Sequence, residues 1–138
     1  MGSSQTYDVA IIGAGIAGLS LALRLPASAR VALFTKGQLG ESNTRYAQGG
    51  VAVALGADDA PELHFQDTIA AGAGLCNEAA VRILVEQASA AVQWLMQLGV
   101  SFDQAQSAGV HATPDGLLLG REAAHRRWRV LHAGGDAT

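Results

Sequence analysis

The chain has 138 residues, a length that suits one domain, and its composition of 49% hydrophobic and 15% charged residues excludes a disordered chain. A net charge of −3 gives no basis for a nucleic-acid surface, and no apolar run approaches the roughly 20 residues that a membrane helix needs. The single cysteine, Cys76, excludes an internal disulfide, and the short polar N-terminus lacks the features of a signal peptide. We therefore expect a soluble, cytoplasmic protein.

The first 34 residues have the pattern of a strand, a glycine turn, a helix and a second strand. Residues 8–12 are an apolar run rich in β-branched side chains, which is typical of a buried parallel strand. An apolar helix follows over residues 19–25, and Pro26 helps to end it. Residues 30–34 are the second strand. This order predicts the first half of a Rossmann-type unit, and so an α/β fold with a parallel sheet.

The glycines between the first strand and the helix match the pattern of dinucleotide-binding turns. Gly13 permits the sharp turn, Gly15 lets the backbone approach a pyrophosphate, and Gly18 lets the helix pack closely on the strand. The amides at the helix N-terminus then hold the phosphate charge. We expect Gly13, Ala14, Gly15, Ala17 and Gly18 to lie at a dinucleotide; the alternative is a tight turn with no ligand.

The second strand lacks the acidic residue that usually binds the ribose hydroxyls of NAD. Thr35 stands at the end of this strand, and Lys36 follows it. The absent acid argues against an ordinary NAD-dependent dehydrogenase. We expect the Thr35 hydroxyl to bond a ribose and Lys36 to meet a phosphate; the alternative for both side chains is solvent exposure.

The rest of the chain predicts two helices joined by short pieces. We expect helices over residues 62–71 and 78–98, with Asn77 as the N-cap of the second and Gly99 at its C-terminal end. Short strands are expected over residues 51–54 and 117–119. An extended piece is expected over residues 100–102 and a turn-rich excursion over residues 107–116.

A second glycine-containing loop, residues 35–50, is long for a connection inside a compact domain, and such loops are usually functional. It combines hydroxyl and amide side chains with a glycine pair that permits close backbone approach to a ring system or a phosphate. A structural loop without a ligand is the alternative. The candidate cofactor-binding residues are Ser42, Asn43, Thr44, Ala47, Gln48, Gly49 and Gly50.

Taken together, the two glycine loops resemble the FAD-binding region of the flavoprotein family that contains succinate dehydrogenase, fumarate reductase and L-aspartate oxidase. Further segments resemble the aspartate oxidase branch of that family. These are residues 64–68, 71–76, 92–95, 98–100, 102–103, 121–125, 129–133 and 136–138.

The resemblance implies a Rossmann-like domain with non-covalent FAD that oxidises L-aspartate to iminoaspartate, with fumarate or oxygen as electron acceptor and quinolinate synthase downstream. It implies that Glu122 recognises the substrate's amino group, which is reasonable because an ammonium favours a carboxylate partner and succinate has no ammonium. His125, three residues on, would share a helix face with Glu122 and join it at the substrate.

Members of this family are several times longer, with capping and C-terminal helical domains. The resemblance thus implies that residues 1–138 are the N-terminal part of an FAD-binding domain, with an incomplete sheet that exposes apolar surface. It places the catalytic acid and the carboxylate-binding residues outside this chain, so no catalytic residue is assigned and we expect the piece alone to be inactive. Ala123 and Ala124 replace a glycine pair that is frequent in the family.

The remaining chemistry-bearing residues favour structural roles. Cys76 has no partner in view, and the four histidines lack the spacing of a metal site. Arg121, Arg126, Arg127 and Arg129 are interpreted as a solvated face or a contact to an absent domain, with phosphate binding as the alternative. Two alternatives to the aspartate oxidase stay open: a succinate or fumarate flavoprotein, and a non-catalytic FAD-binding remnant.

Overall fold

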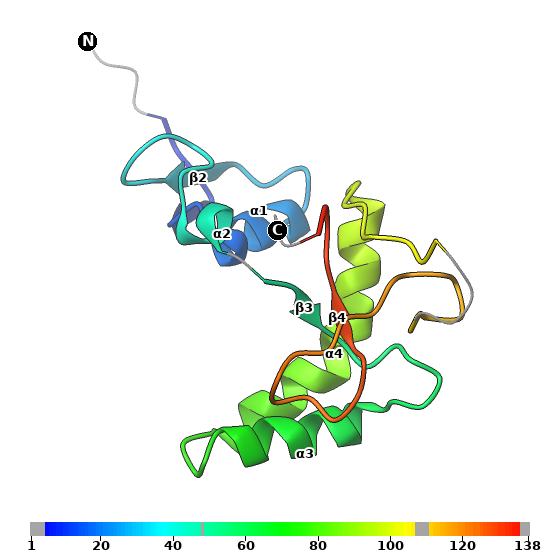
Figure 1. The fold of residues 1–138 in the computed structure, drawn as a ribbon. Helices are drawn as coiled ribbons and strands as arrows, with labels where there is room; N and C mark the ends of the chain where they lie inside the picture. The colour runs from blue at the N-terminus through cyan, green and yellow to red at the C-terminus, as the bar shows by residue number, and fades with distance from the viewer. Residues whose placement is uncertain (1–4, 48, 107–110, 136–138) are drawn as a thin grey trace. The chain divides into compact units, whose positions relative to one another are not determined.

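A computed structural model describes residues 5–47, 49–106 and 111–135 of the chain (Figure 1). The chain divides into two compact units, residues 1–47 and 48–138. The first contains β1 (Val9–Ile12), α1 (Ile16–Arg24), β2 (Val31–Phe34) and α2 (Asn43–Tyr46). The second contains β3 (Val51–Ala52), α3 (Pro61–Ala71), α4 (Glu78–Gln97) and β4 (Val130–Leu131).

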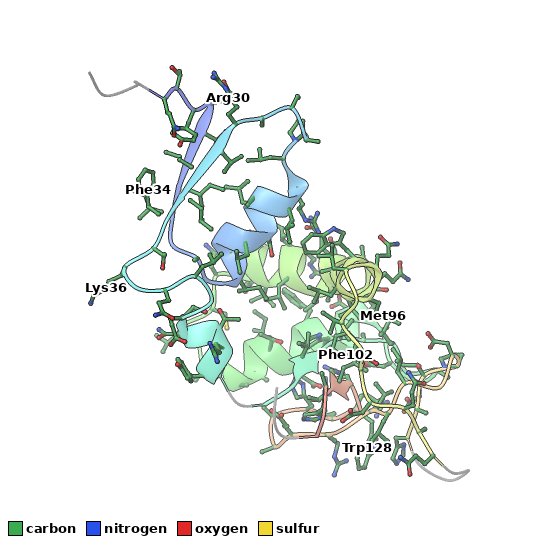
Figure 2. The ribbon with its side chains drawn as sticks, turned by 90° about the horizontal axis from the view of Figure 1, so that it is seen from above. Arg30, Phe34, Lys36, Met96, Phe102 and Trp128 are labelled. Atoms are coloured by element: carbon green, nitrogen blue, oxygen red, sulfur yellow. The ribbon has the colours of Figure 1, made fainter. Side chains whose placement is uncertain are left out.

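The first unit is a parallel strand–helix–strand unit, which confirms the predicted fold class. β1 pairs with β2 in parallel, with Val9 opposite Val31 and Ile12 opposite Phe34. Figure 2 shows α1 on one side of this two-stranded sheet and the Phe34 side chain directed to the other side. Ile12 is 90% exposed and Phe34 is 57% exposed. Apolar surface on the sheet is therefore open to solvent, as the sequence predicted.

The ends of the helices in the second unit follow local sequence signals. The Asn77 side chain accepts a hydrogen bond from the Ala80 amide at 3.1 Å, which confirms the predicted N-cap of α4. Gly99, beyond the last turn, has φ +99°, the left-handed conformation that a C-terminal glycine supplies. After α3, the Cys76 thiol lies against Gly72, where an added Cβ would be 2.1 Å from Sγ. Cys76 is thus half-buried and packed against the C-terminal end of α3.

The core of the second unit joins α4 to the loops and short strands around it. Buried apolar side chains form one cluster of Val53, Val92, Phe102, Leu117, Leu119 and Leu131. β3 pairs with β4 in antiparallel fashion, with Val51 opposite Leu131. This strand pair joins the beginning and the end of the second unit. The sequence did not predict β4, because it has only two residues.

The predicted strands of the second unit are shorter in the structure. The strand expected at 51–54 ends at Ala52, and in place of the strand expected at 117–119 only Leu117 and Leu118 form isolated bridges. The turn expected before residue 117 is present: Gly116 has φ +94° and its amide donates to the Thr113 carbonyl at 3.0 Å. Residues 107–110 of the predicted excursion lie outside the described residues. Among the helices that the structure describes, none is long and apolar enough to cross a membrane.

Candidate functional site

The glycine turn after β1 is shaped by close approaches between backbone atoms. Gly13 has φ +106°, and its amide donates to the Phe34 carbonyl at 2.8 Å. A Cβ added to Gly18 would lie 1.9 Å from the Gly13 carbonyl oxygen and 3.3 Å from Ile11 Cγ2. Gly18 is thus the point where α1 crosses the turn, which is the packing role that the sequence predicted for it.

The N-terminus of α1 faces the segment that carries Ser42 and Thr44. Gly15 is the N-cap and offers no side chain, and the Thr44 hydroxyl accepts a hydrogen bond from the Ile16 amide at 3.2 Å. A Cβ on Gly15 would lie 3.5 Å from Thr44 Oγ1. The sequence predicted a loop here, whereas residues 43–46 form the short helix α2. Two predicted cofactor segments therefore meet within the first unit.

This helix end fits a diphosphate group. The first turn of α1 carries no acidic side chain, and Gly15 at the N-cap places no side chain in front of the amides. Unpaired amides and the positive end of the helix dipole favour an anion at such a position. Thr44 already satisfies one amide, so a bound phosphate would share this helix end with the Thr44 hydroxyl.

The other predicted cofactor residues of the first unit differ in exposure. Ala14 is 5% exposed and packs inside, whereas Ala17, Asn43 and Ala47 are exposed. Thr35 and Lys36 are also exposed and follow the carboxyl end of β2, where ligands bind in open α/β sheets. Figure 2 shows the Lys36 side chain directed outward from this loop.

The glycine pair of the second loop has a structural reason that the sequence did not reveal. A Cβ on Gly50 would lie 2.3 Å from Val130 Cγ1 and 2.5 Å from the Leu131 carbonyl oxygen. Gly49 has φ +116°. Gly50 is thus required by the close packing of the chain on β4. Both glycines belong to the second unit, and Gln48 lies outside the described residues.

Glu122 and His125 lie in a turn, so the expectation of a shared helix face is wrong. The His125 amide donates to the Glu122 carbonyl at 3.0 Å and closes this turn. Glu122 is exposed, whereas His125 is half-buried with its ring edge toward the ring of His64, at a centroid distance of 5.5 Å. Of the two side chains, Glu122 is therefore the one that is exposed to solvent, and His125 packs toward His64.

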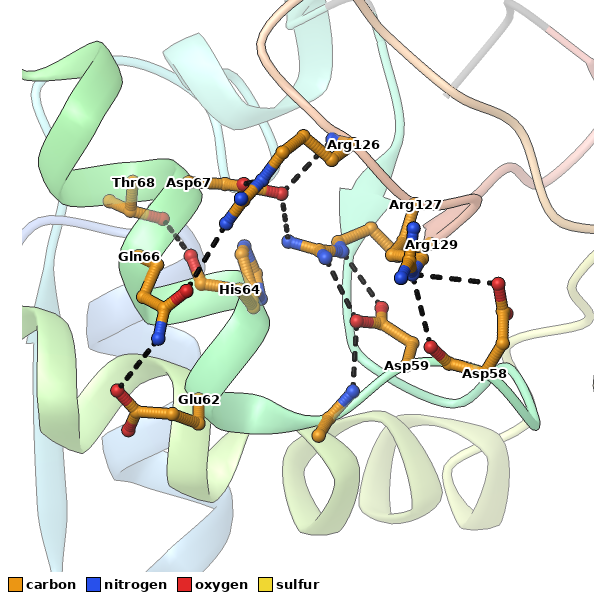
Figure 3. Close-up of polar contacts among 11 residues, drawn as sticks. Asp58, Asp59, Glu62, His64, Gln66, Asp67, Thr68, Arg126, Arg127 and Arg129 are labelled. Atoms are coloured by element: carbon orange, nitrogen blue, oxygen red, sulfur yellow. Dashed lines mark hydrogen bonds and ion pairs between the residues drawn. The ribbon is translucent and has the colours of Figure 1, made fainter.

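A buried ion network lies beneath this turn (Figure 3). Arg129 donates to both carboxylate oxygens of Asp59 at 2.8 Å, and both side chains are fully buried. Arg129 Nη1 is 3.1 Å from Asp67 Oδ2. From the sequence, Arg129 was expected to be part of a solvated face or a contact to an absent domain. That interpretation is wrong for Arg129, because its guanidinium is the buried centre of this network.

Asp67 connects the network to the turn. Its Oδ2 accepts the Arg126 backbone amide at 3.0 Å, and its Oδ1 contacts Arg126 Nε. Burial opposes ionisation of Asp67, but the hydrogen bonds from Arg126 outweigh it and hold the pKa of this carboxyl below its usual value. A buried carboxylate with two cationic partners stays charged.

His64, one turn before Asp67 on α3, completes the buried face. Its side chain is 3% exposed, and its Nδ1 has no hydrogen-bond partner. Burial, followed by the neighbouring charges of Arg129 and His125, lowers the pKa of His64. His64 also lines an apolar groove of about 630 Å³ between β3 and one face of α4. The sequence signal for this face was weak, since only His64 and Asp67, three residues apart, marked it.

No group of three or more His, Cys, Asp or Glu side chains in the described part of the chain could hold a metal ion. Two arrangements among the described residues offer binding chemistry. One is a helix end suited to a diphosphate in the first unit, and the other is an exposed carboxylate on a braced turn in the second.

Curated L-aspartate oxidases are among the proteins that are similar to this chain. L-aspartate oxidase of Streptomyces coelicolor is 50% identical over 132 residues, which cover 95% of this chain and 22% of that protein. L-aspartate oxidase of Mesorhizobium japonicum is 52% identical over 130 residues, covering 93% of this chain and 24% of that protein. The chain thus spans less than a quarter of the length of these curated relatives.

Solved structures give the same result for the fold. A quinol fumarate reductase of E. coli superposes with a TM-score of 0.81 at 30% identity, covering 95% of this chain and 22% of that chain. The Mycobacterium smegmatis Sdh1 complex in the apo form gives a TM-score of 0.78 at 30% identity, with the same coverage. The model of the family described as FAD binding domain matches residues 8–138. The chain is therefore a homologue of L-aspartate oxidases and belongs to the FAD-binding domain family.

Proposed function

We propose that this chain binds FAD without a covalent bond and supplies the N-terminal part, residues 1–138, of the FAD-binding domain of an L-aspartate oxidase. The observation that carries the proposal is the α1 N-terminus, where Gly15 leaves the amides accessible and the Thr44 hydroxyl lies beside them. The identity of 44–52% to curated L-aspartate oxidases supports the choice within the family.

In this proposal the chain's own residues bind and orient the cofactor. Backbone at Gly13 to Gly15 and the α1 dipole hold the pyrophosphate beside the exposed Ala17, and Gly18 lets α1 pack closely on the turn. Thr35 and Lys36 serve the ribose and a phosphate, and the residues between Ser42 and Gly50 line the flavin. When bound, FAD supplies the two-electron oxidation.

Glu122 is proposed to recognise the substrate. Its exposed carboxylate pairs with the ammonium of L-aspartate. The half-buried His125 supports the turn, because its backbone amide donates to the Glu122 carbonyl. The product would be iminoaspartate, with electrons passing to oxygen or fumarate. In the cytoplasm, quinolinate synthase would consume this product.

A succinate or fumarate flavoprotein is the second candidate, and the solved structures favour it. The fumarate reductase of E. coli shares the fold at 30% identity. We prefer the aspartate oxidase because identity to curated members reaches 52% over 130 residues. A non-catalytic FAD-binding protein is the third candidate, and turnover separates it from both.

The cofactor proposal is tested on the 138-residue chain by absorbance after incubation with FAD and desalting. We expect retained flavin bands, and we expect Gly15→Val to abolish them because a branched side chain blocks the pyrophosphate. Ala27→Val is the control, since Ala27 is exposed and lies outside both the glycine turn and the loop of residues 35–50. Stoichiometric FAD in the Gly15→Val protein would show that the pyrophosphate lies elsewhere.

The substrate proposal is tested in a chimera, because the chain matches about a fifth of its relatives. The chain replaces the matched residues of the Streptomyces coelicolor L-aspartate oxidase, and turnover of L-aspartate and of succinate is measured. Glu122→Gln should lower kcat/KM for aspartate about tenfold or more while succinate binding changes little, because only aspartate has the ammonium. Glu86→Gln, an exposed acid on α4, is the control. Equal losses for both ligands contradict the assignment.

A further inference from the structure

The backbone of the turn that carries Glu122 is attached to α3 by the carboxylate of Asp67, and the Arg126 side chain adds contacts to Asp67 and Gln66. Asp67 Oδ2 accepts the Arg126 backbone amide at 3.0 Å, across 59 residues of sequence. The next hydrogen bond along the turn joins the His125 amide to the Glu122 carbonyl at 3.0 Å. The orientation of the Glu122 backbone therefore depends on a chain of two hydrogen bonds that begins at Asp67.

The anchor itself is held rigidly. Asp67 is 4% exposed, and its Oδ2 lies 3.1 Å from Nη1 of Arg129, which is in turn paired with Asp59 through two hydrogen bonds of 2.8 Å. Figure 3 shows Asp67 between Arg126 and Arg129. A carboxylate fixed from behind by a buried cation has little freedom to follow a moving turn.

A second contact from the same helix face supports the turn. His64 precedes Asp67 by three residues, so both side chains leave α3 on one face. The His64 ring meets the His125 ring edge-on at a centroid distance of 5.5 Å. The turn thus contacts α3 through a backbone amide and through a ring.

The ion pair to the Arg126 side chain does not explain this arrangement. That side chain is 62% exposed although its partner Asp67 is 2% exposed, so solvent reaches and screens the ion pair from the Arg126 side. The hydrogen bond to the Arg126 backbone amide is independent of the residue type and acts on the path of the chain. The backbone amide is thus the contact through which Asp67 acts on the turn.

We propose that Asp67 is a positioning residue that fixes the turn from Glu122 to Arg126, so that the Glu122 carboxylate meets the substrate ammonium in one orientation. The inference rests on the proposed role of Glu122 in recognising L-aspartate. Asp67 acts through the turn and does not itself contact substrate.

The first arm of the test uses the 138-residue chain and measures hydrogen exchange of the His125 amide, which closes the turn. Asp67→Ala should speed this exchange about tenfold or more, since the turn loses its anchor. Arg126→Ala keeps the backbone amide and should stay within about twofold of the parent. Arg127→Ala, which removes an exposed cation paired with Asp58, is the control for loss of charge. Exchange that is equal in all variants would overturn the anchor.

Asp67→Ala also leaves the buried Arg129 with Asp59 alone, so its folded fraction is measured first by tryptophan fluorescence. If this variant does not fold, Arg126→Pro takes its place, because proline removes the same amide donor and leaves the Asp67–Arg129 pair intact. Unchanged exchange in Arg126→Pro then overturns the anchor equally.

The second arm uses the chimera and measures kinetics with L-aspartate, with succinate as a competitive inhibitor. We expect Asp67→Ala to raise KM for aspartate about tenfold, with kcat, FAD content and the succinate inhibition constant within about twofold. In the double variant with Glu122→Gln, Asp67→Ala should add no further loss of aspartate preference, because both changes act on one contact. Additive losses, or equal losses for aspartate and succinate, would indicate a merely structural role and overturn the positioning role.

Failure of the underlying proposal is recognisable separately. If Glu122→Gln alone leaves the preference for aspartate over succinate unchanged, the substrate role of Glu122 is wrong, and the positioning role falls with it. In that case the exchange arm still reports whether Asp67 anchors the turn. A normal Glu122 effect with an unchanged Asp67→Ala enzyme overturns only the positioning role.

Discussion

In the first unit the closest packing is between backbone atoms, since a Cβ on Gly18 would lie 1.9 Å from the Gly13 carbonyl oxygen. In the second unit charged side chains from distant positions meet in the interior, and Arg129 pairs with Asp59 across 70 residues. The first arrangement leaves a helix end accessible to a ligand, and the second braces a turn. Absent side chains thus shape the glycine turn of the first unit, whereas charged side chains from distant segments hold a turn in place in the second.

The buried cation is the place to break the second unit, and we expect the largest effect there. Arg129→Met leaves the carboxylate of Asp59 buried without its cation and leaves Asp67 with Arg126 alone, which costs about 3–5 kcal/mol in free energy of unfolding. Both tryptophans, Trp94 and Trp128, lie in the second unit, so denaturation followed by tryptophan fluorescence reports on it.

The control for this prediction is Arg127→Met. Arg127 pairs with Asp58 at 3.5 Å on the surface, so its removal should change the free energy of unfolding by less than about 1 kcal/mol. Equal losses for the two variants would mean that net charge, and not the buried network, determines the stability of this unit.

The crossing glycine is the corresponding place to break the first unit. Gly18→Ala places a methyl group against the Gly13 carbonyl, which is backbone and cannot move away as a flexible side chain could. We expect a loss of about 1–3 kcal/mol in the free energy of unfolding of this unit and loss of FAD retention. Amide hydrogen exchange at residues 19–24 provides the measurement.

Gly15→Ala sharpens this prediction. A Cβ there would lie 3.5 Å from Thr44 Oγ1, an ordinary contact, so the fold should survive. FAD retention should nevertheless fall, because the methyl group stands before the α1 amides. If both variants lose the fold, Gly15 is structural and its proposed place at the pyrophosphate is wrong.

The second unit should also be sensitive to pH through His64. Burial, with Arg129 and His125 nearby, lowers the pKa of His64 in the folded state, so the unfolded state binds the proton more strongly. The stability from neutral His64 is therefore present above about pH 6.5 and is lost as the pH falls toward the lowered pKa. Asp67, whose pKa is also lowered, loses its contribution only as the pH falls below its usual value of 3.8.

Unfolding by denaturant at pH 7.5 and pH 5.5 tests this dependence. The parent should be less stable at pH 5.5, and His64→Phe should reduce the difference because the titrating group is gone. His111→Phe is the control, since His111 is exposed and stacks on Trp128 at a centroid distance of 4.1 Å. A pH dependence that His64→Phe leaves unchanged would assign the titration to another group.

The sequence predicted the first unit closely because its signals are local. The strand, turn, helix and strand follow one another within 34 residues, and Gly18 could be assigned its packing role from the spacing of the glycines. α2 was missed because four residues carry too little periodicity to distinguish a helix from a loop.

The second unit was predicted less well because its contacts join distant residues. Helical periodicity and the Asn77 cap gave α4 to within one residue of its end. The packing of Gly50 on β4, the burial of Arg129 and the turn at Glu122 each depend on segments that meet only after folding. A side chain's sequence neighbours do not reveal such a partner, so Arg129 was interpreted as solvated.

The smallest effect sharpens that distinction within the second unit. Asn77→Ala removes the cap that accepts the Ala80 amide at 3.1 Å, which should cost about 1 kcal/mol in the free energy of unfolding. Asn77→Ser retains an acceptor and should lose only a few tenths of a kcal/mol. Tryptophan fluorescence during denaturation provides the measurement, as for Arg129→Met. We expect the charged contacts between distant residues to stabilise this unit more than its local sequence signals do. An equal decrease in the free energy of unfolding for Asn77→Ala and Arg129→Met would contradict this expectation.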